Sequence, residues 1–134
     1  MYCFDTDTLS AVIRRDPPLG LIRRLAQLPA AEQFTTTITL GELLYGAARK
    51  GSPKLTARVR DVVAIASTVL PFDDRAAETY GPLRAQLESA GRRLDEPDLR
   101  IASIALSRSL TVVTGNVRHF ARVPGLAVEN WLDA

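Results

Sequence analysis

MYCFDTDTLS, residues 1–10, joins a short apolar run to a helical segment through two carboxylates. Residues 2–4 have the character of a buried strand, and residues 8–15 are compatible with a helix. Asp5 and Asp7 lie between the two. An open α/β sheet places charge in this way at the carboxyl edge of its strands, where such folds hold their ligands. The segment therefore predicts an α/β fold with a site at that edge.

The rest of the chain repeats the alternation of strand and helix. Further strands are expected at 33–38, 68–72, 110–114 and 126–128, and helices at 19–28, 39–50, 54–66, 75–90 and 98–109. Strands and helices that alternate over short links favour a parallel sheet. We predict an α/β fold with three α/β/α layers, in which a central parallel sheet of four to five short strands has helices on both faces.

Length and composition indicate a single globular domain. The 134 residues are 46% hydrophobic and 24% charged, which is enough to form a sizeable core. No apolar run reaches the roughly 18 residues of a membrane span, and no secretory signal is visible. The single cysteine, Cys3, excludes an internal disulfide and is interpreted as a core residue. These features fit a reducing cytoplasm, with no membrane partner.

Four side chains are expected at one edge of the sheet, namely Asp5, Glu42, Asp98 and Asn116. Asp5 and Asp7 each fit two roles, helix N-cap or ligand, and both cannot be the same cap. Glu42 either completes a capping box that begins at residue 39, or faces a cleft from the side of its helix opposite the apolar stripe.

Asp98 and Asn116 have their own alternatives. Asp98 shares a helix face with apolar residues, so it must cap the helix or bind something, because an unpaired buried carboxylate is costly. Asp95 and Glu96, just before it, are expected to be solvated. Asn116 follows the strand LTVVT, and asparagine is also an ordinary turn residue.

Carboxylates that converge repel one another unless a cation offsets their charge. A set of oxygen ligands suits Mg²⁺ or Mn²⁺ better than zinc. The only histidine, His119, cannot form a zinc site alone and is interpreted as a surface or packing residue. A divalent ion held by such acids activates water for phosphodiester hydrolysis and offsets charge on the scissile phosphate.

Four segments, in this order and spacing, carry a family resemblance: YCFDTDTLS, TTTITLGELLYGA, LDEPDLRIASIAL and LTVVTGNVRHFARVPGLAVENW. The chain resembles PIN-domain ribonucleases, specifically the VapC toxins of VapBC toxin–antitoxin modules. The resemblance implies one PIN domain over residues 1–134. It also implies a Mg²⁺- or Mn²⁺-dependent endoribonuclease that cuts structured RNA such as tRNA or rRNA and so inhibits translation. The implied partners are a second copy in a homodimer or a larger assembly, and a VapB-type antitoxin whose C-terminal segment covers the cleft.

The resemblance also assigns residues. Asp5, Glu42 and Asp98 match the acidic positions of the family, as catalytic residues and metal ligands. Asn116 matches a fourth catalytic position, where many members have aspartate and many others asparagine. Asp7 stands where asparagine is more usual, so it either caps the helix or supplies the charge that Asn116 lacks.

Supporting roles follow from position. Thr6 and Thr114 are expected to hydrogen-bond the carboxylates or a water ordered by the ion. In-line attack by such a water would leave a 5′-phosphate and a 3′-hydroxyl. Four arginines near the same edge are candidates for contacts with RNA phosphates: Arg92, Arg93, Arg100 and Arg118.

Two alternatives come from other functional classes. A receiver-type signalling domain also places acids and Mg²⁺ at a sheet edge, but it would need a lysine after its last strand, and LAVENW has none. A catalytically silent PIN-like module would bind a partner or nucleic acid without cleavage, and a metal titration distinguishes it from an enzyme.

Overall fold

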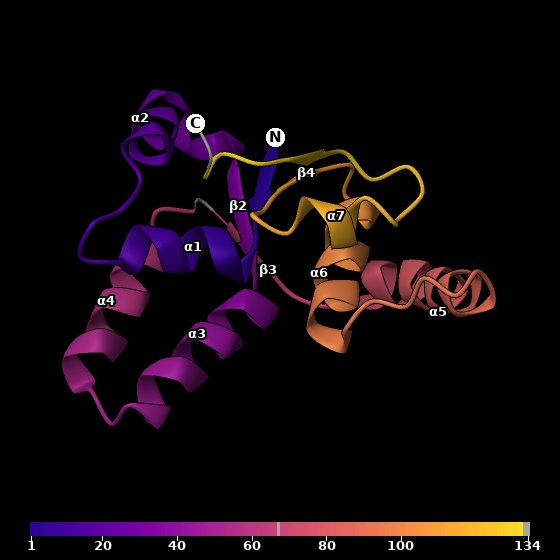
Figure 1. Ribbon diagram of the computed structural model, residues 1–134, viewed down its shortest axis with the longest axis horizontal. Helices are drawn as coiled ribbons and strands as arrows, with labels where there is room; N and C mark the ends of the chain where they lie inside the picture. The colour runs from indigo at the N-terminus through magenta and orange to yellow at the C-terminus, as the bar shows by residue number, and fades with distance from the viewer. Residues whose placement is uncertain (67, 133–134) are drawn as a thin grey trace.

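The computed structural model describes residues 1–66 and 68–132 (Figure 1). Within these residues the chain forms a five-stranded sheet in the order β3-β2-β1-β4-β5, and all of its pairings are parallel. The strands are β1 (Tyr2–Phe4), β2 (Gln33–Thr36), β3 (Thr68–Leu70), β4 (Thr111–Val113) and β5 (Val128–Glu129). Helices cover both faces, so the prediction of a three-layer fold with a parallel central sheet is confirmed.

The helices lie close to the predicted segments. They are α1 (Thr6–Ile13), α2 (Leu19–Gln27), the 3₁₀ helix η1 (Ala30–Glu32), α3 (Thr37–Arg49), α4 (Pro53–Val63), α5 (Asp74–Ser89), α6 (Glu96–Ser107) and α7 (Val117–Phe120). The sequence did not indicate η1 and α7, which are each too short for a periodic pattern. In the described part of the chain, no helix is both long and apolar enough to cross a bilayer.

The predicted start of the first helix was two residues too late, since α1 begins at Thr6, and so were the predicted starts of α3 and α6. α3 begins at Thr37 because the hydroxyl of Thr36 accepts a hydrogen bond from the backbone N–H of Thr39. α6 begins at Glu96, with Pro97 in its first turn, where proline needs no hydrogen-bonded N–H. These shifts matter for the site, because they change which residues are available to cap each helix.

The sheet separates two hydrophobic cores because successive strand residues point to opposite faces. Cys3 and Val112 lie in the core beneath α5 and α6, whereas Phe4 and Val113 lie in the core beneath α1, α2, α3 and α4. All four side chains are fully buried. This alternation fixes the register of the two central strands and so fixes which residues follow them at the carboxyl edge.

The strand order reverses at β1, which pairs with β2 on one side and β4 on the other. Phe4 and Val113, the last residues of β1 and β4, are direct partners. Asp5 and Thr114 therefore leave the sheet side by side. This reversal point is where open α/β sheets hold their ligands.

Candidate active site

Asp5 is both a helix cap and a residue of the sheet edge. Its carboxylate accepts a hydrogen bond of 2.9 Å from the backbone N–H of Thr8, and it also accepts one from the hydroxyl of Thr114. Only 3% of the residue is exposed. Burial raises the pKa of Asp5 to about 6, the two hydrogen bonds oppose the rise, and the charge of Asp7 adds to it. Asp5, and not Asp7, is the N-cap of α1.

Glu42 is held by the residue that follows Asp5. The hydroxyl of Thr6 donates a 2.6 Å hydrogen bond to its carboxylate. The interpretation of Glu42 as part of a capping box with Thr39 is wrong, because Thr36 is the N-cap of α3. Glu42 and Thr6 also line a groove of about 420 Å³ between α1, α3 and α4. Leu43 and Ala47 of the apolar stripe line the same groove, so it lies between Glu42 and that stripe rather than on the opposite face of α3.

Asp98 lies in the first turn of α6 and is half-buried. Burial is the main reason that the pKa of Asp98 rises to about 6, and the charges of Glu42 and Asp7 raise it further. Within residues 1–66 and 68–132, Asp98 makes no hydrogen bond or ion pair through its carboxylate. The predicted capping role is absent, since Asp95 is the N-cap residue of α6.

Asp7 is exposed in the first turn of α1 and its charge acts on two other carboxylates, Asp5 and Asp98. It also borders the turn after β4: a Cβ atom built on Gly115 would lie 4.0 Å from an Asp7 carboxylate oxygen and 2.7 Å from the Leu132 side chain. A side chain at this position would require the end of the Leu132 side chain to move. Asp7 thus contributes negative charge beside the turn that contains Asn116.

Asn116 and Thr114 complete this turn. The hydroxyl of Thr114 accepts a 2.8 Å hydrogen bond from the backbone N–H of Asn116. The amide oxygen of Asn116 contacts Nδ1 of His119, and the His119 side chain lies close enough to Asp98 to lower its pKa. His119 is therefore a member of the site that its sequence context did not reveal, because the short helix α7 brings it back toward α6.

The arginines proposed to bind phosphate are more widely spaced than the acids of the site. Arg92 and Arg93 are exposed in the connection before α6, and Arg118 is exposed on α7. In the described part of the chain, none of the four arginines pairs with an acid of the site. Arg100 instead donates a 3.2 Å hydrogen bond to Glu96.

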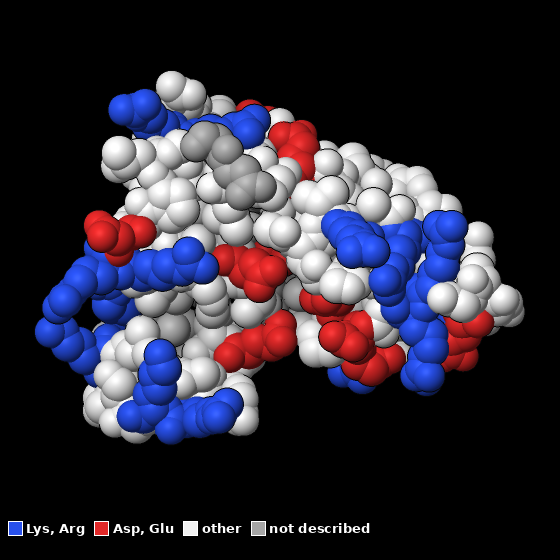
Figure 2. All heavy atoms as spheres, viewed as in Figure 1, with Lys and Arg blue, Asp and Glu red and all other residues white. Residues whose placement is uncertain are grey.

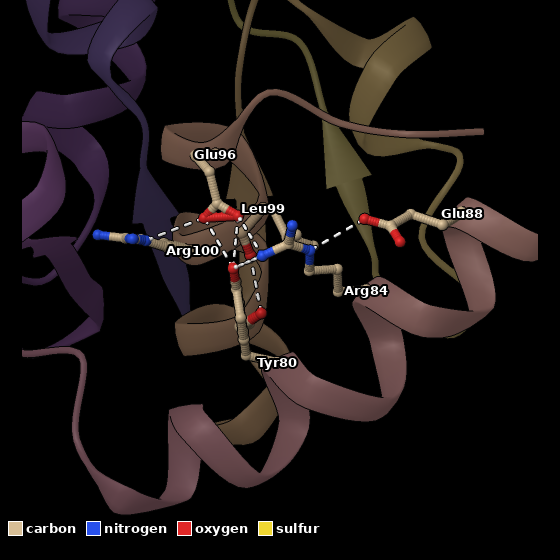
Figure 3. Close-up of polar contacts among 7 residues, drawn as sticks. Tyr80, Arg84, Glu88, Glu96, Leu99 and Arg100 are labelled. Atoms are coloured by element: carbon tan, nitrogen blue, oxygen red, sulfur yellow. Dashed lines mark hydrogen bonds and ion pairs between the residues drawn. The ribbon is translucent and has the colours of Figure 1, made fainter. Parts of the chain in front are cut away.

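Glu96 is not simply solvated, as the sequence suggested. It accepts hydrogen bonds from Tyr80 of α5 and forms ion pairs with Arg84 of α5 and Arg100 of α6 (Figure 3). The Tyr80 hydroxyl is the largest reason that the pKa of Glu96 is lowered. These contacts fasten the first turn of α6 to α5, and that turn also holds Asp98.

The four carboxylates Asp5, Asp7, Glu42 and Asp98 thus meet where α1, α3 and α6 begin. Figure 2 shows acidic side chains gathered at the centre of this face, with basic side chains on both flanks, over α3 and α4 and over α5 to α7. Among residues 1–66 and 68–132, no three acidic, histidine or cysteine side chains already surround one point as metal ligands. Their mutual repulsion and oxygen-only donors nevertheless fit a hard divalent cation.

Residues 2–126 match the PIN domain family. The chain is 34% identical over 131 residues to ribonuclease VapC2 of Haemophilus influenzae, with 98% of each chain covered. It is 35% identical to the tRNA(fMet)-specific endonuclease VapC of Salmonella typhimurium, with 97% of each covered.

Solved structures agree with the sequence relatives. The DNA-bound VapBC structure from Salmonella typhimurium contains a chain that superposes with a TM-score of 0.89 at 34% identity, with 97% of each chain covered. VapBC2 from Rickettsia felis, bound to a promoter DNA fragment, gives a TM-score of 0.87 at 29% identity, with 97% of this chain and 98% of the other covered.

The fold and the acidic edge define a PIN domain, and nucleases of this family generally use divalent metal ions. The chain belongs to this family, among the VapC ribonucleases of VapBC toxin–antitoxin systems. The receiver-type alternative is therefore wrong.

Proposed function

We propose that this VapC ribonuclease is a Mg²⁺- or Mn²⁺-dependent endoribonuclease that cleaves structured RNA, tRNA or rRNA, and so inhibits translation in the cytoplasm. The observation that supports it best is the meeting of Asp5, Asp7, Glu42 and Asp98 at the reversal point of the sheet. Two curated relatives are named as tRNA(fMet)-specific endonucleases, which makes tRNA the first substrate to test.

Asp5, Glu42 and Asp98 would hold the ion. When bound, the ion would lower the pKa of a water ligand and offset charge on the scissile phosphate. Hydrogen bonds from the chain itself orient two of these three carboxylates, those of Asp5 and Glu42. Thr8 and Thr114 orient the Asp5 carboxylate, and Thr6 orients that of Glu42.

Asn116 would offer the ion a neutral amide oxygen at the fourth acidic position of the family, and this oxygen already contacts Nδ1 of His119. Asp7 borders the same turn and supplies negative charge there. We therefore assign Asp7 as the residue that compensates for the neutral Asn116, rather than as a cap. The arginines Arg92, Arg93, Arg100 and Arg118 would contact RNA phosphates, Arg100 after release from Glu96.

The expected partners are a second copy of the chain and a VapB-type antitoxin. Several structural relatives are VapBC complexes. The groove beside Glu42 has apolar walls that include Leu43, Leu55 and Val59, with Arg14 and Lys50 among its lining residues. An antitoxin segment placed there would cover the acidic site, which accounts for neutralisation without any change in the fold.

The test is cleavage of tRNA in Mg²⁺ by the purified chain and by Asp98→Asn, with Asp74→Asn as the matched control. Asp74 is an exposed first-turn aspartate of α5 that does not cap its helix. Asp98→Asn should lose about 100-fold or more of the cleavage rate, while Asp74→Asn keeps it. Circular dichroism checks that both variants fold. Full cleavage by folded Asp98→Asn would refute the proposal, and parent protein that binds Mg²⁺ but cuts no RNA would support the silent-module alternative.

A further inference from the structure

Tyr45 is a largely exposed aromatic residue of α3. It is 67% exposed, and within residues 1–66 and 68–132 it makes no hydrogen bond or ring contact. It lies one turn beyond Glu42. A single tyrosine on a helix forms no motif of its own, so the sequence did not indicate a role for it.

The spacing of α3 places Tyr45 on the side of the helix that carries Glu42. Ile38, Glu42, Tyr45 and Arg49 follow one another at intervals of four, three and four residues, so they form a single stripe along the helix. Ile38 packs against the core that includes Leu99 of α6, and the charge of Glu42 acts on Asp98 of α6.

The stripe thus faces α6 at its inner end and passes the acidic centre at Glu42. Tyr45 and Arg49 continue it outward, on the lobe of α3 and α4 where Figure 2 shows basic side chains beyond the acidic centre. A bound strand that passes Glu42 and Asp98 would contact the ring of Tyr45 first and the cation of Arg49 one turn later.

The surroundings of Tyr45 favour a nucleobase over a protein surface. Its exposed neighbours on the helix are Gly41, Ala48 and Arg49, and a Cβ atom on Gly41 would meet no other atom within 4 Å. The ring is accessible and lacks the contiguous apolar patch that protein interfaces use. A single base needs only one uncovered aromatic face, and stacking adds affinity without placing more charge beside the carboxylates.

We propose that Tyr45 is a base-stacking residue, which holds an unpaired nucleotide of the RNA next to the scissile phosphate while Arg49 contacts a neighbouring phosphate. The assignment rests on the proposed ribonuclease function and adds a substrate-binding subsite to it. It also implies that the RNA is single-stranded at the cleavage point, because a paired base would first have to break its pairing and stacking at a cost in free energy.

The test measures cleavage and binding of unfractionated tRNA. Tyr45→Ala should raise KM about 10-fold with little change in kcat, Tyr45→Phe should restore KM, and Tyr45→Leu should not, because stacking needs a flat π surface. Leu19→Ala is the control, since Leu19 is comparably exposed at 71% on α2. In the Asp98→Asn background, Tyr45→Trp should show quenched indole fluorescence when tRNA binds. Arg49→Gln should lower the slope of log affinity against log salt by about 0.7.

Unchanged KM in Tyr45→Ala would overturn the proposal. So would a loss of dimerisation or of antitoxin binding in Tyr45→Ala with tRNA binding intact, because Tyr45 would then belong to a protein interface. These results are distinct from failure of the ribonuclease function itself, which appears as cleavage by Asp98→Asn or as no cleavage by the parent chain.

Discussion

The two walls of the acidic site are built differently. At the β1–α1 junction, the backbone N–H of Thr8 holds the carboxylate of Asp5, and the hydroxyl of Thr6 holds that of Glu42 on α3. On α6, Asp98 has no such bond among the described residues, and its helix is fastened to α5 through Glu96 instead. Burial raises the pKa of Asp5 and of Asp98 to about 6, yet hydrogen bonds oppose the rise at Asp5 while neighbouring charges increase it at Asp98.

This difference shows how the protein keeps carboxylates that repel one another close together. The junction is rigid because its donors lie in the turn that follows the strand, so the carboxylates there keep their places without a cation. The Asp98 side chain can respond to a cation, because only the helix backbone restrains it. Changes at the junction should therefore cost more than changes at the α5–α6 contact.

The largest expected effect is on stability against pH in metal-free protein. The folded-state pKa of Asp5 is about 6 against an ordinary value of 3.8, so the folded chain binds more protons than the unfolded chain between these values. The free energy of unfolding should therefore fall as pH rises through this window, by up to about 3 kcal/mol from Asp5. The half-buried Asp98 adds a smaller change of the same sign. Urea unfolding in EDTA at pH 4, 5, 6 and 7 measures it.

Asp5→Asn is the matched variant for this pH experiment. Asparagine caps a helix about as well as aspartate, but it does not titrate. The variant should lose most of the pH dependence and be more stable than the parent at pH 7. A parent whose stability is flat from pH 5 to pH 7 would contradict the assigned shift.

The second expected effect is at Thr6. Thr6→Val keeps the shape of the side chain but removes the hydroxyl that holds Glu42. A hydrogen bond to a charged group contributes about 1.5–3 kcal/mol, so cleavage of tRNA should fall about 10-fold or more. Thr6→Ser retains the hydroxyl and should recover most of the rate. Equal rates for the valine variant and the parent would show that Glu42 needs no such support.

The smallest expected effect is at the α5–α6 contact. Tyr80→Phe removes the hydroxyl that donates to Glu96, on a partly exposed network. The loss should be about 0.5–1 kcal/mol of unfolding free energy, with cleavage changed less than in Thr6→Val. Thermal denaturation and initial rates measure the two quantities. If Tyr80→Phe lost more of the cleavage rate than Thr6→Val, the contact between α5 and α6 would be the more important support for the site.

Sequence alone determined the parallel sheet and the acids that follow its strands. The short apolar run at residues 2–4 and the buried run at 110–114 depend on local chemistry, and carboxylates after such strands must lie at one edge. Position in the chain could not say which acid caps a helix, because Asp5, Asp7 and Glu42 all had a capping pattern. That choice depends on where the helices begin, which Thr36 and Pro97 shift by two residues.

Tertiary structure decided the contacts between elements that are far apart in the chain. Thr6 meets Glu42 across 36 residues, and Tyr80 meets Glu96 from another helix. His119 returns to the site through a helix too short to show a pattern. The exposure of Tyr45 became visible only once the face of α3 was known. Such contacts depend on how the helices of the two cores pack against the sheet. Local sequence patterns show which residues are apolar, but they do not show which helices lie side by side.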